Sequence, residues 1–459
     1  MPGDTAHTMR INTEIFKAYD IRGLYPGEVN EEVARQIGRG FVVYLGASKI
    51  GVSRDMRVSS PGIAAAFIQG AREQGADVVD YGMLGTDMLY FAVVNDGLEG
   101  GAQITASHNP KQYNGIKMVR SGALPLSGDQ GLGEIRDMIV NDTLPRPAAT
   151  PGSVSPRNII FEYVEKVMSF IDPSVITPFT VVLDAGSGMA GLVAPLLFDQ
   201  LPCRTTKLCF DIDGTFPHHE ANPLLEENRR DITEEVIRQK ADVGIAWDGD
   251  ADRCFFIDGS GEFISGDFIT ALLAEAFLLK HPGATILYDL RASYAVKDVV
   301  AKYGATALMN RVGHAFFKSR MRETNAIFGG EVTGHYYFRD NFYADNGFIP
   351  AMLILELMSK KQQSLHELLA PLRARYFISG EINTKLPHMD AVPQKLAHIA
   401  ARYADAREYQ LDGLSVEYPD WHFNFRPSNT EPLLRLNLEA VTPELMAAKR
   451  DEVIALIRE

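Results

Sequence analysis

The sequence predicts an α/β protein of several domains, and three observations support this prediction. Short apolar runs typical of strands alternate with amphipathic helical stretches along the chain. The chain has 459 residues, roughly the length of three or four domains. Three of the apolar runs lead directly into polar loops. Because ligands of open α/β sheets bind beyond the carboxyl ends of strands, we expect three domains to face one cleft.

The expected strands are short, and helical patterns separate several of them. One apolar helical run, 269–279, is too short to span a bilayer and contains Glu275. The clearest expected strands are 50–52, 102–105, 180–183, 243–246 and 285–288, and the clearest expected helices are 158–171 and 232–241.

Three segments are candidate domain boundaries. Segment 144–157 contains four prolines, which continue neither a helix nor a central strand. A tight turn at 258–261 is the second candidate, and segment 371–376 is the third. We therefore expect domains at residues 1–155, 156–257, 258–373 and 374–459.

Charge and cysteine content exclude several classes of protein. A formal net charge of −14 argues against non-specific binding to nucleic acid or to an anionic membrane. An anionic substrate therefore requires positive side chains gathered at its site. Cys203, Cys209 and Cys254 form no CxxC pair, which is typical of a reducing compartment. No apolar stretch of the signal-peptide type is found, so we expect a cytoplasmic protein.

The first polar loop, 105–110, places Ser107 beside His108 on a turn that Pro110 constrains. A serine is a weak nucleophile without a neighbouring base, and His108 and Lys117 are candidates for moving a proton or balancing charge. An ordinary serine and asparagine turn that caps a helix explains the same residues equally well. The loop alone leaves both interpretations open.

The second polar loop has Asp248, Asp250 and Asp252 at alternate positions, followed by Arg253. Hard oxygen ligands at this spacing are typical of a Mg²⁺ or Ca²⁺ site. An EF-hand is excluded, because Arg253 and Gly259 would occupy the positions that need Gly and Glu. We expect a divalent-cation site rather than a solvated acidic turn, since the preceding run is strongly apolar.

Two further segments have compositions typical of sugar and phosphate binding. Glu331, Thr333 and His335 alternate on one loop, where a carboxylate beside a hydroxyl can bind two neighbouring sugar hydroxyls, although a surface turn is the alternative. Near the C-terminus, two arginines flank small polar residues and prolines, a composition that can surround a phosphate. The residues of this second segment are Arg426, Ser428, Asn429, Thr430 and Arg435.

Two motifs indicate other protein classes. Residues 186–191 match G-x-G-x-x-G after an apolar run, and Asp211 follows 20 residues later, as in an NAD-dependent oxidoreductase. Residues 210–215 resemble the aspartyl-phosphate motif of haloacid-dehalogenase-type phosphotransferases, but a proline and two histidines follow where a helix is expected. Neither motif accounts for the serine, acidic and arginine segments, so we rank both below phosphoryl transfer on a sugar phosphate.

Five segments together resemble the α-D-phosphohexomutase family, and within it the bacterial phosphomannomutase/phosphoglucomutase branch. Each segment is short, but all five occur in the family's order across essentially the whole chain. They are 19–23 (Tyr-Asp-Ile-Arg-Gly), 105–110 (Thr-Ala-Ser-His-Asn-Pro), 248–253 (Asp-Gly-Asp-Ala-Asp-Arg), 330–335 (Gly-Glu-Val-Thr-Gly-His) and 426–432 (Arg-Pro-Ser-Asn-Thr-Glu-Pro).

The resemblance implies four domains around a central cleft. The first three share an α/β topology of a mixed sheet flanked by helices, and the fourth is a smaller α+β domain. It also implies an enzyme that interconverts hexose 6-phosphate and hexose 1-phosphate, with mannose ahead of glucose, through a phosphoserine. Hexose 1,6-bisphosphate serves as intermediate and activator, one Mg²⁺ is bound per chain, and the chain is a monomer or homodimer.

The resemblance also assigns roles to single residues. Ser107 matches the phosphoserine, and its phosphate joins Asp248, Asp250 and Asp252 around Mg²⁺. Glu331 and Thr333 match the pair that binds sugar hydroxyls 3 and 4. Reaction-centre positions are matched by Tyr19, Arg22, Lys117, Arg253 and His314, and the distal phosphate clamp by Arg426, Ser428, Asn429 and Thr430, with Arg435 as a weaker match.

Some positions depart from the family's pattern. Thr333 stands where the branch often has Ser, and Arg291 stands where some members have Lys, although the hydroxyl and the charge are kept. Val332 stands where phosphoglucosamine mutases usually have Gln, so we rank that activity below mutase activity on mannose and glucose phosphates. A non-catalytic sugar-phosphate sensor with the same binding site is a further alternative.

Overall fold

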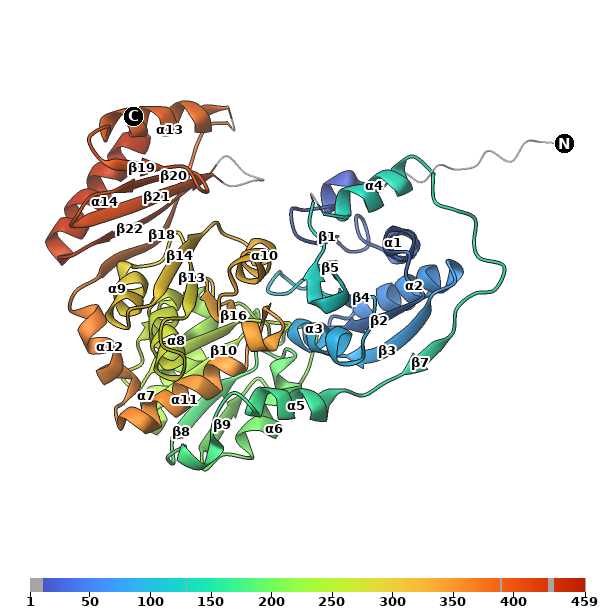
Figure 1. The fold of residues 1–459 in the computed structure, drawn as a ribbon, viewed down its shortest axis with the longest axis horizontal. Coiled ribbons are helices and arrows are strands. Elements are labelled where there is room, and N and C mark those ends of the chain that lie inside the picture. The colour runs from blue at the N-terminus through green and yellow to red at the C-terminus, as the bar shows by residue number, and fades with distance from the viewer. Residues whose placement is uncertain (1–10, 129, 389, 428–432, 459) are drawn as a thin grey trace.

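The computed structural model describes residues 11–128, 130–388, 390–427 and 433–458, which form four sheets built from successive segments of the chain (Figure 1). The first sheet lies apart on one side of the molecule, and the fourth lies at the opposite upper corner of the view. Among the described residues, no helix is both long and apolar enough to cross a membrane.

The first sheet has the strand order β1-β5-β4-β2-β3-β7, with β6 paired to β5. It is mixed, because β2 runs parallel to β3 and β4 whereas β5 runs antiparallel to β4 and β1. Its strands are β1 (Ile21–Leu24), β2 (Lys49–Arg54), β3 (Asp77–Met83), β4 (Gly100–Ile104), β5 (Tyr113–Arg120), β6 (Leu124–Pro125) and β7 (Val154–Pro156), and its helices are α1 (Glu31–Leu45), α2 (Ser60–Glu73), α3 (Thr86–Asn95) and α4 (Leu132–Val140).

The second sheet, ordered β12-β11-β10-β8-β9, and the third, ordered β14-β13-β15-β16-β17, are also mixed, with a parallel core and antiparallel additions. The second comprises β8 (Thr180–Asp184), β9 (Arg204–Leu208), β10 (Val243–Trp247), β11 (Cys254–Asp258) and β12 (Phe263–Ile264), with α5 (Ile160–Met168), α6 (Ala190–Phe198) and α7 (Arg230–Gln239). The third comprises β13 (Thr285–Asp289), β14 (Thr306–Asn310), β15 (Phe328–Gly330), β16 (Tyr336–Phe338) and β17 (Ala344–Asp345), with α8 (Gly266–Lys280), α9 (Tyr294–Lys302), α10 (His314–Thr324), α11 (Ile349–Lys361) and α12 (Leu365–Arg373).

The fourth sheet differs from the others because all of its neighbouring strands are antiparallel, in the order β18-β22-β21-β20-β19. Its strands are β18 (Phe377–Lys385), β19 (Arg407–Tyr409), β20 (Leu414–Glu417), β21 (Trp421–Pro427) and β22 (Leu433–Ala440), with α13 (Ala391–Arg402) and α14 (Pro443–Arg458). Short 3₁₀ helices occur at η1 (Thr13–Ile15), η2 (Ser121–Ala123), η3 (Pro173–Val175), η4 (Glu226–Arg229) and η5 (Arg339–Asn341).

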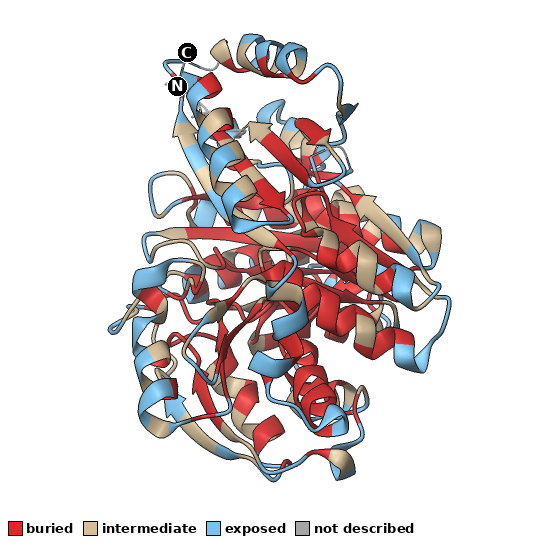
Figure 2. Ribbon diagram, turned by 90° about the vertical axis from the view of Figure 1, so that its left-hand side faces the viewer, coloured by how far each residue is buried: buried red, intermediate tan, exposed pale blue. Residues whose placement is uncertain are grey.

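The hydrophobic core is continuous through the first three sheets but separate in the fourth. One buried cluster includes Phe91 of α3, Tyr163 of α5, Trp247 of β10 and Phe348 before α11. The buried residues of the fourth sheet form their own cluster, which includes Phe425. In Figure 2, buried residues accordingly fill the central layers of the molecule. The fourth sheet can therefore shift against the rest without opening a shared core.

The expected strands are confirmed in β2, β4, β8, β10 and β13, except that β4 ends at Ile104, one residue before the expected end of strand 102–105. The helix expected over 158–171 is shorter, because it ends at Met168 before a bend that leads to Pro173. The turn at 258–261 joins β11 to β12 inside the second sheet, so a boundary at 258 would separate β12 from its partner strand. We therefore propose the four expected domains with the second extended to Ile264.

Candidate active site

Ser107 lies in the loop that follows β4, in a left-handed backbone conformation with φ of 51° that is uncommon for a residue other than glycine. Its backbone N–H donates to Thr105 Oγ1 at 2.8 Å, which fixes the turn. The buried Ser107 Oγ donates to Asp248 Oδ2 at 2.9 Å and lies 3.2 Å from His108 Nδ1. The serine of the first sheet thus contacts the acidic loop of the second.

A buried arginine holds the serine loop in place. The Arg57 side chain is 1% exposed, and its Nε donates to Asp55 Oδ2 at 3.2 Å. Its two terminal nitrogens donate to four backbone carbonyls of the loop and the following strand. These carbonyls belong to Ser107, Asn109, Pro110 and Tyr113, at 2.7, 2.6, 2.8 and 3.1 Å. No sequence pattern singled out Arg57, although its place in the polar segment that follows the apolar run 50–52 was a signal that could have identified it.

The acidic loop follows β10 and buries its three aspartates completely. One carboxylate oxygen from each of Asp248, Asp250 and Asp252 lies within 4.8 Å of the other two. Within the described residues, Asp250 Oδ1 and Asp252 Oδ1 have no hydrogen-bond partner. Buried, unpaired carboxylate oxygens are costly unless a cation neutralises them. The three aspartates therefore fit a hard divalent cation such as Mg²⁺.

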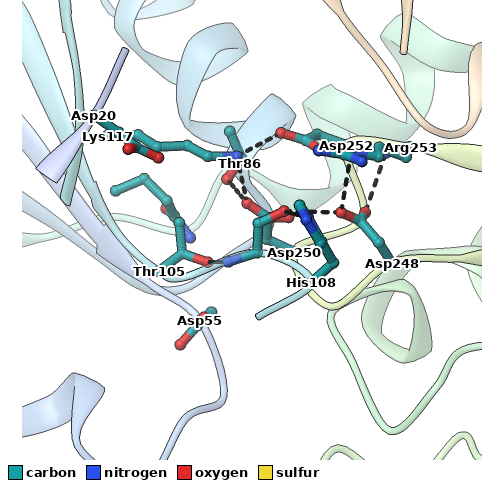
Figure 3. A network of polar contacts seen from close by, with 12 residues as sticks. Asp20, Asp55, Thr86, Thr105, His108, Lys117, Asp248, Asp250, Asp252 and Arg253 are labelled. Atoms are coloured by element: carbon teal, nitrogen blue, oxygen red, sulfur yellow. Dashed lines mark hydrogen bonds and ion pairs between the residues drawn. The ribbon is translucent and has the colours of Figure 1, made fainter. Parts of the chain in front are cut away.

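Lys117 and Thr86 tie the acidic loop to the first sheet (Figure 3). Lys117 Nζ of β5 lies 2.8 Å from Asp250 Oδ2 and 2.7 Å from Asp252 Oδ2. At the start of α3, the Thr86 hydroxyl donates to Asp250, and the Thr86 N–H donates to the Asp250 carbonyl at 3.0 Å. Thr86 was also missed, because this contact joins residues far apart in the sequence.

Burial and the close approach of charged groups shift the pKa values of Asp248, Lys117 and His108. Burial and then the neighbouring Asp250 raise the pKa of Asp248 well above its usual range. Burial opposes the charge of Lys117, but Asp250 and Asp252 outweigh it and raise the pKa of the ammonium group. Burial, followed by the charge of Arg253, lowers the pKa of His108. His108 is therefore neutral and able to exchange a proton with Ser107, whereas Lys117 holds its proton and balances charge.

Side chains from all four sheet regions meet in one cavity of about 600 Å³. Arg22 on β1 is ion-paired with Asp20 and donates to Asn109 Oδ1 at 2.6 Å. Arg253 lies with its Nε 3.7 Å from Asp248 Oδ2. The predicted residues that line this cavity are Tyr19, Arg22, Ser107, Lys117, Arg253, His314, His335, Arg426 and Arg435.

The far wall of the cavity contains a buried network centred on Asp345 of β17. Lys318 Nζ and His335 Nδ1 lie 2.8 and 3.1 Å from its two carboxylate oxygens, and His335 Nδ1 is also 3.8 Å from Asp252 Oδ1. Burial and then the charge of Lys318 lower the pKa of His314 at the start of α10. Asp345 and Lys318 were missed, since neither belongs to a recognisable motif.

The predicted sugar-binding residues are not all brought to this cavity. Glu331 is buried and accepts hydrogen bonds from the Tyr337 hydroxyl and from the Gly313 N–H at 3.1 Å. Thr333 instead lines a second cavity of about 500 Å³, between the second, third and fourth sheets, together with Arg291. Arg291 is paired with Asp289 and lies 3.9 Å from Glu331.

The predicted phosphate-binding segment is only partly described. Arg426 on β21 and Arg435 on β22 are directly opposite each other in the strand register. Burial and then the charge of Arg291 lower the pKa of Arg426, as expected where positive charges gather. Ser428, Asn429 and Thr430 lie outside the described residues. The two arginines place positive charge at the side of the cavity opposite the acidic loop.

Comparison with known proteins decides the family. Four profiles described as domains of phosphoglucomutase/phosphomannomutase match in chain order. The α/β/α domains I, II and III match residues 13–145, 161–261 and 265–376, and the C-terminal domain matches residues 381–456. The chain belongs to the phosphoglucomutase/phosphomannomutase family. The four-domain architecture expected from the resemblance is confirmed.

Relatives in the phosphoglucomutase/phosphomannomutase family match over nearly their whole length. A phosphomannomutase of Escherichia coli is 42% identical over 453 residues, which cover 96% of this chain and 99% of the relative. The phosphohexose mutases of Xanthomonas campestris strain B100 are 41% identical, with the same coverage of both chains. A solved structure of a family protein from Burkholderia thailandensis superposes with a TM-score of 0.88 at 33% identity, covering 98% of each chain.

The glycine-rich turn at 186–191 has a structural explanation within the phosphoglucomutase/phosphomannomutase fold. A Cβ added at Gly188 would lie 2.7 Å from the Gly249 carbonyl oxygen, and one at Gly191 would lie 2.8 Å from the Phe210 carbonyl oxygen. These glycines therefore allow the backbone of the acidic loop and its neighbour to pack closely. That packing accounts for these glycines without a bound dinucleotide.

Proposed function

We propose that this chain interconverts hexose 6-phosphate and hexose 1-phosphate, with mannose as the preferred sugar and glucose as a second substrate. The observation that carries the proposal is the 2.9 Å hydrogen bond from Ser107 Oγ to Asp248 Oδ2, on the wall of a cavity that also contains arginines of three sheets. A hydroxyl at a three-carboxylate cation site, facing separate positive charges, suits phosphoryl transfer on an anionic sugar. Family membership supports the same reaction.

The three aspartates of the acidic loop and the phosphate carried by Ser107 would hold Mg²⁺. When bound, the cation supplies positive charge to the phosphoryl group in the transition state. Arg253 and Lys117 lie close enough to add charge stabilisation from the protein itself. The site contributes mainly positioning and electrostatics, because the reaction needs little other covalent chemistry from the protein.

Proton balance gives His108 a role in this proposal. When the phosphoryl group passes from Ser107 to a substrate hydroxyl, the phosphorus–Oγ bond breaks and a bond to the substrate oxygen forms. The hydroxyl proton must leave the substrate, and Ser107 Oγ must gain one. Neutral His108, with Nδ1 3.2 Å from Ser107 Oγ, is placed to relay the proton: Nδ1 gives its proton to Ser107 Oγ while the other ring nitrogen takes up the proton of the substrate hydroxyl, and the reverse transfer runs the relay backwards.

The two transfers require the sugar to be bound in both orientations. Transfer to the free hydroxyl at carbon 1 or 6 would give hexose 1,6-bisphosphate, which then turns round and returns its other phosphate to Ser107. Arg426 and Arg435, with Ser428, Asn429 and Thr430, would bind the phosphate that is not reacting. Glu331, Thr333, His335 and Arg291 would contact the sugar once the fourth sheet closes on it, which its separate core supports.

Intact mass and activity together test the phosphoserine. The protein should carry one phosphate and should convert mannose 6-phosphate to mannose 1-phosphate when supplied with Mg²⁺ and a trace of hexose 1,6-bisphosphate. Ser107→Ala should lose both properties, whereas Ser121→Ala, at an exposed serine after β5, should keep both. Full mutase activity in Ser107→Ala would refute the assignment of the carrier.

The same assays separate the alternatives. A sugar-phosphate sensor would bind mannose 6-phosphate without forming mannose 1-phosphate, and an oxidoreductase would bind a dinucleotide without turning over any phosphosugar. Faster turnover of glucosamine 6-phosphate than of mannose 6-phosphate would indicate a phosphoglucosamine mutase. Light scattering tests whether the chain is a monomer or a homodimer.

A further inference from the structure

A second group of metal-ligating side chains lies outside the active site, in the second sheet region. It consists of Asp184 at the end of β8, Cys209 directly after β9, and His219 in the segment that leads to η4. One ligand atom from each residue lies within 4.8 Å of the other two. We propose that these three residues form a binding site for a borderline transition-metal ion, with Zn²⁺ as the expected occupant.

The distances match those of a tetrahedral site. His219 Nε2 lies 3.0 Å from Asp184 Oδ2 and 3.7 Å from Cys209 Sγ. A tetrahedral zinc ion with usual bond lengths separates a nitrogen from an oxygen by roughly 3.3 Å and from a sulfur by roughly 3.6 Å. The two separations from His219 Nε2 therefore differ from those of a zinc site by a few tenths of an ångström or less, and Asp184 Oδ2 and Cys209 Sγ lie within 4.8 Å of each other.

The hydrogen bonding of the His219 ring points to a cation at Nε2. Its Nδ1 lies 2.9 Å from the Glu220 carbonyl oxygen, which can only accept, so Nδ1 carries a proton. The other nitrogen faces the carboxylate of Asp184 and the sulfur of Cys209. Nε2 therefore carries a second proton, accepts the S–H proton of Cys209 or presents its lone pair to a metal ion. A carbonyl that fixes the tautomer from behind is typical of metal-binding histidines.

The backbone frame presents the three donors without help from a metal. Asp184 is 2% exposed, and its Oδ1 accepts the Gly186 N–H at 2.9 Å, which leaves Oδ2 for the cluster. Ser187 links the two neighbouring segments, because its N–H donates to the Cys209 carbonyl at 2.8 Å and its own carbonyl accepts the Asp213 N–H at 3.0 Å. Asp184 and Cys209 are thus held at the carboxyl ends of adjacent parallel strands.

The donor set separates this site from the acidic loop. Sulfur and imidazole nitrogen favour zinc, whereas the three carboxylates of Asp248, Asp250 and Asp252 favour magnesium. The His219 side chain is 10% exposed, so water can reach a fourth coordination position. The carboxylate and the sulfur contact the same nitrogen, whereas in a catalytic triad the nucleophile and the carboxylate contact different nitrogens of the histidine.

A metal at this position would stabilise a segment that packs against the acidic loop and against Arg57. The segment that carries His219 also contains Ala221, whose Cβ would lie 3.6 Å from a Cβ added at Gly249 of the acidic loop. Earlier in the same segment, the Phe216 ring centroid lies 5.4 Å from Cζ of Arg57, which holds the serine loop. The site therefore connects to both catalytic loops through packing, and its expected role is structural.

Cobalt binding to the full-length protein tests the proposal, with Mg²⁺ in excess to occupy the acidic loop. Co²⁺ bound to a thiolate gives an intense near-ultraviolet charge-transfer band, which a site made only of carboxylates does not give. The protein should show this band at one equivalent, and Zn²⁺ should abolish it. Cys209→Ser should remove the band and lower Zn²⁺ affinity by at least about tenfold, while Cys203→Ser should change neither.

Two further measurements keep the test decisive. Asp184→Asn preserves the size of the side chain and should weaken Zn²⁺ binding while circular dichroism shows an unchanged fold. Affinity should rise with pH, because the metal displaces protons from the imidazole and the thiol. Absence of the band in the folded parent protein, or its persistence in Cys209→Ser, would overturn the proposal. Neither result would bear on mutase activity, which is assayed separately.

Discussion

The proposed active site has two parts that differ in how firmly they are held. One part consists of the serine and acidic loops, and the other consists of the proposed sugar- and phosphate-binding residues. The two loops are joined directly by the Ser107 Oγ to Asp248 hydrogen bond at 2.9 Å, and Lys117 of β5, 2.7 Å from Asp252, ties the acidic loop to the first sheet. They also rest on the core that the first three sheets share. The chemical half of the cavity is therefore assembled before any substrate binds.

The recognition half is divided between two cavities and two cores. Arg435 lines the cavity of Ser107, whereas Thr333 and Arg291 line the other. The fourth sheet meets the third partly through a polar contact, in which the partly buried Glu381 lies 3.6 Å from the buried Arg291. This difference indicates that chemistry depends on a rigid frame, whereas recognition also depends on the fourth sheet, which has its own core. Substitutions in the first half should lower kcat, and substitutions in the second should mainly change KM.

The largest expected effect is that of Asp250→Asn. The change removes one cation ligand and one partner of Lys117, so kcat should fall by roughly 10³-fold, or about 4 kcal/mol of transition-state stabilisation. Steady-state kinetics over a Mg²⁺ titration measures this loss. Asp211→Asn, at an exposed aspartate, is the control. A variant that recovers full kcat at saturating Mg²⁺ would contradict the rigid assembly of this half.

Arg57→Lys tests whether the hydrogen bonds that hold the serine loop are needed for catalysis, because Arg57 does not contact the reacting atoms. Lysine keeps the charge but cannot reach four carbonyls, so kcat should fall by roughly 10²-fold as Ser107 loses its position. The free energy of unfolding should decrease by roughly 3 kcal/mol, because buried groups lose their partner. Denaturant unfolding and kinetics measure the two effects, with Arg54→Lys, at a partly buried arginine of β2, as the matched control. If the variant is destabilised but keeps its kcat, Arg57 stabilises the fold without positioning Ser107 for the reaction.

The sequence predicted the parts of the site that depend on local pattern. Asp248, Asp250 and Asp252 were recognisable because three ligands follow one strand, and Ser107 because its loop has a constrained turn. Arg57 and Thr86 were not, since their partners lie far away in the sequence and only the packed sheets bring them together. The fold class was predictable for the same reason as the acidic loop, because strand and helix periodicity is local.

Residues of the recognition half were harder to place from the sequence. Glu331 and Thr333 are two positions apart, yet the first is buried against Tyr337 and the second faces another cavity. Their separation depends on how the third and fourth sheets sit together, which no local pattern encodes. The motif placed these residues on one loop but did not indicate which side chains reach the cavity of Ser107.

Arg435→Ala should change substrate affinity more than turnover. The change removes one positive charge from the wall opposite the acidic loop, so KM for mannose 6-phosphate should rise by roughly tenfold, or about 1.4 kcal/mol. The value of kcat should change by less than about threefold, because Ser107 keeps its bonds. Initial rates over a substrate series measure both. A loss of kcat as large as that of Asp250→Asn would show that the two halves are not independent.

The smallest expected effect is the change in KM caused by Glu381→Gln. The direction of this change shows whether the fourth sheet moves against the rest of the protein or is held rigidly. Glu381 on β18 lies 3.6 Å from Arg291 Nη1 and 3.7 Å from Arg435 Nη1, and its side chain is 31% exposed. On a movable frame the carboxylate competes with the substrate phosphate for these arginines, so Glu381→Gln should lower KM by about threefold, within the range of an exposed ion pair. On a rigid frame Glu381 would instead position the arginines, and KM would rise. Kinetics at low and high salt, with Glu408→Gln on β19 as the exposed control, measures the direction, and the effect should weaken as salt increases.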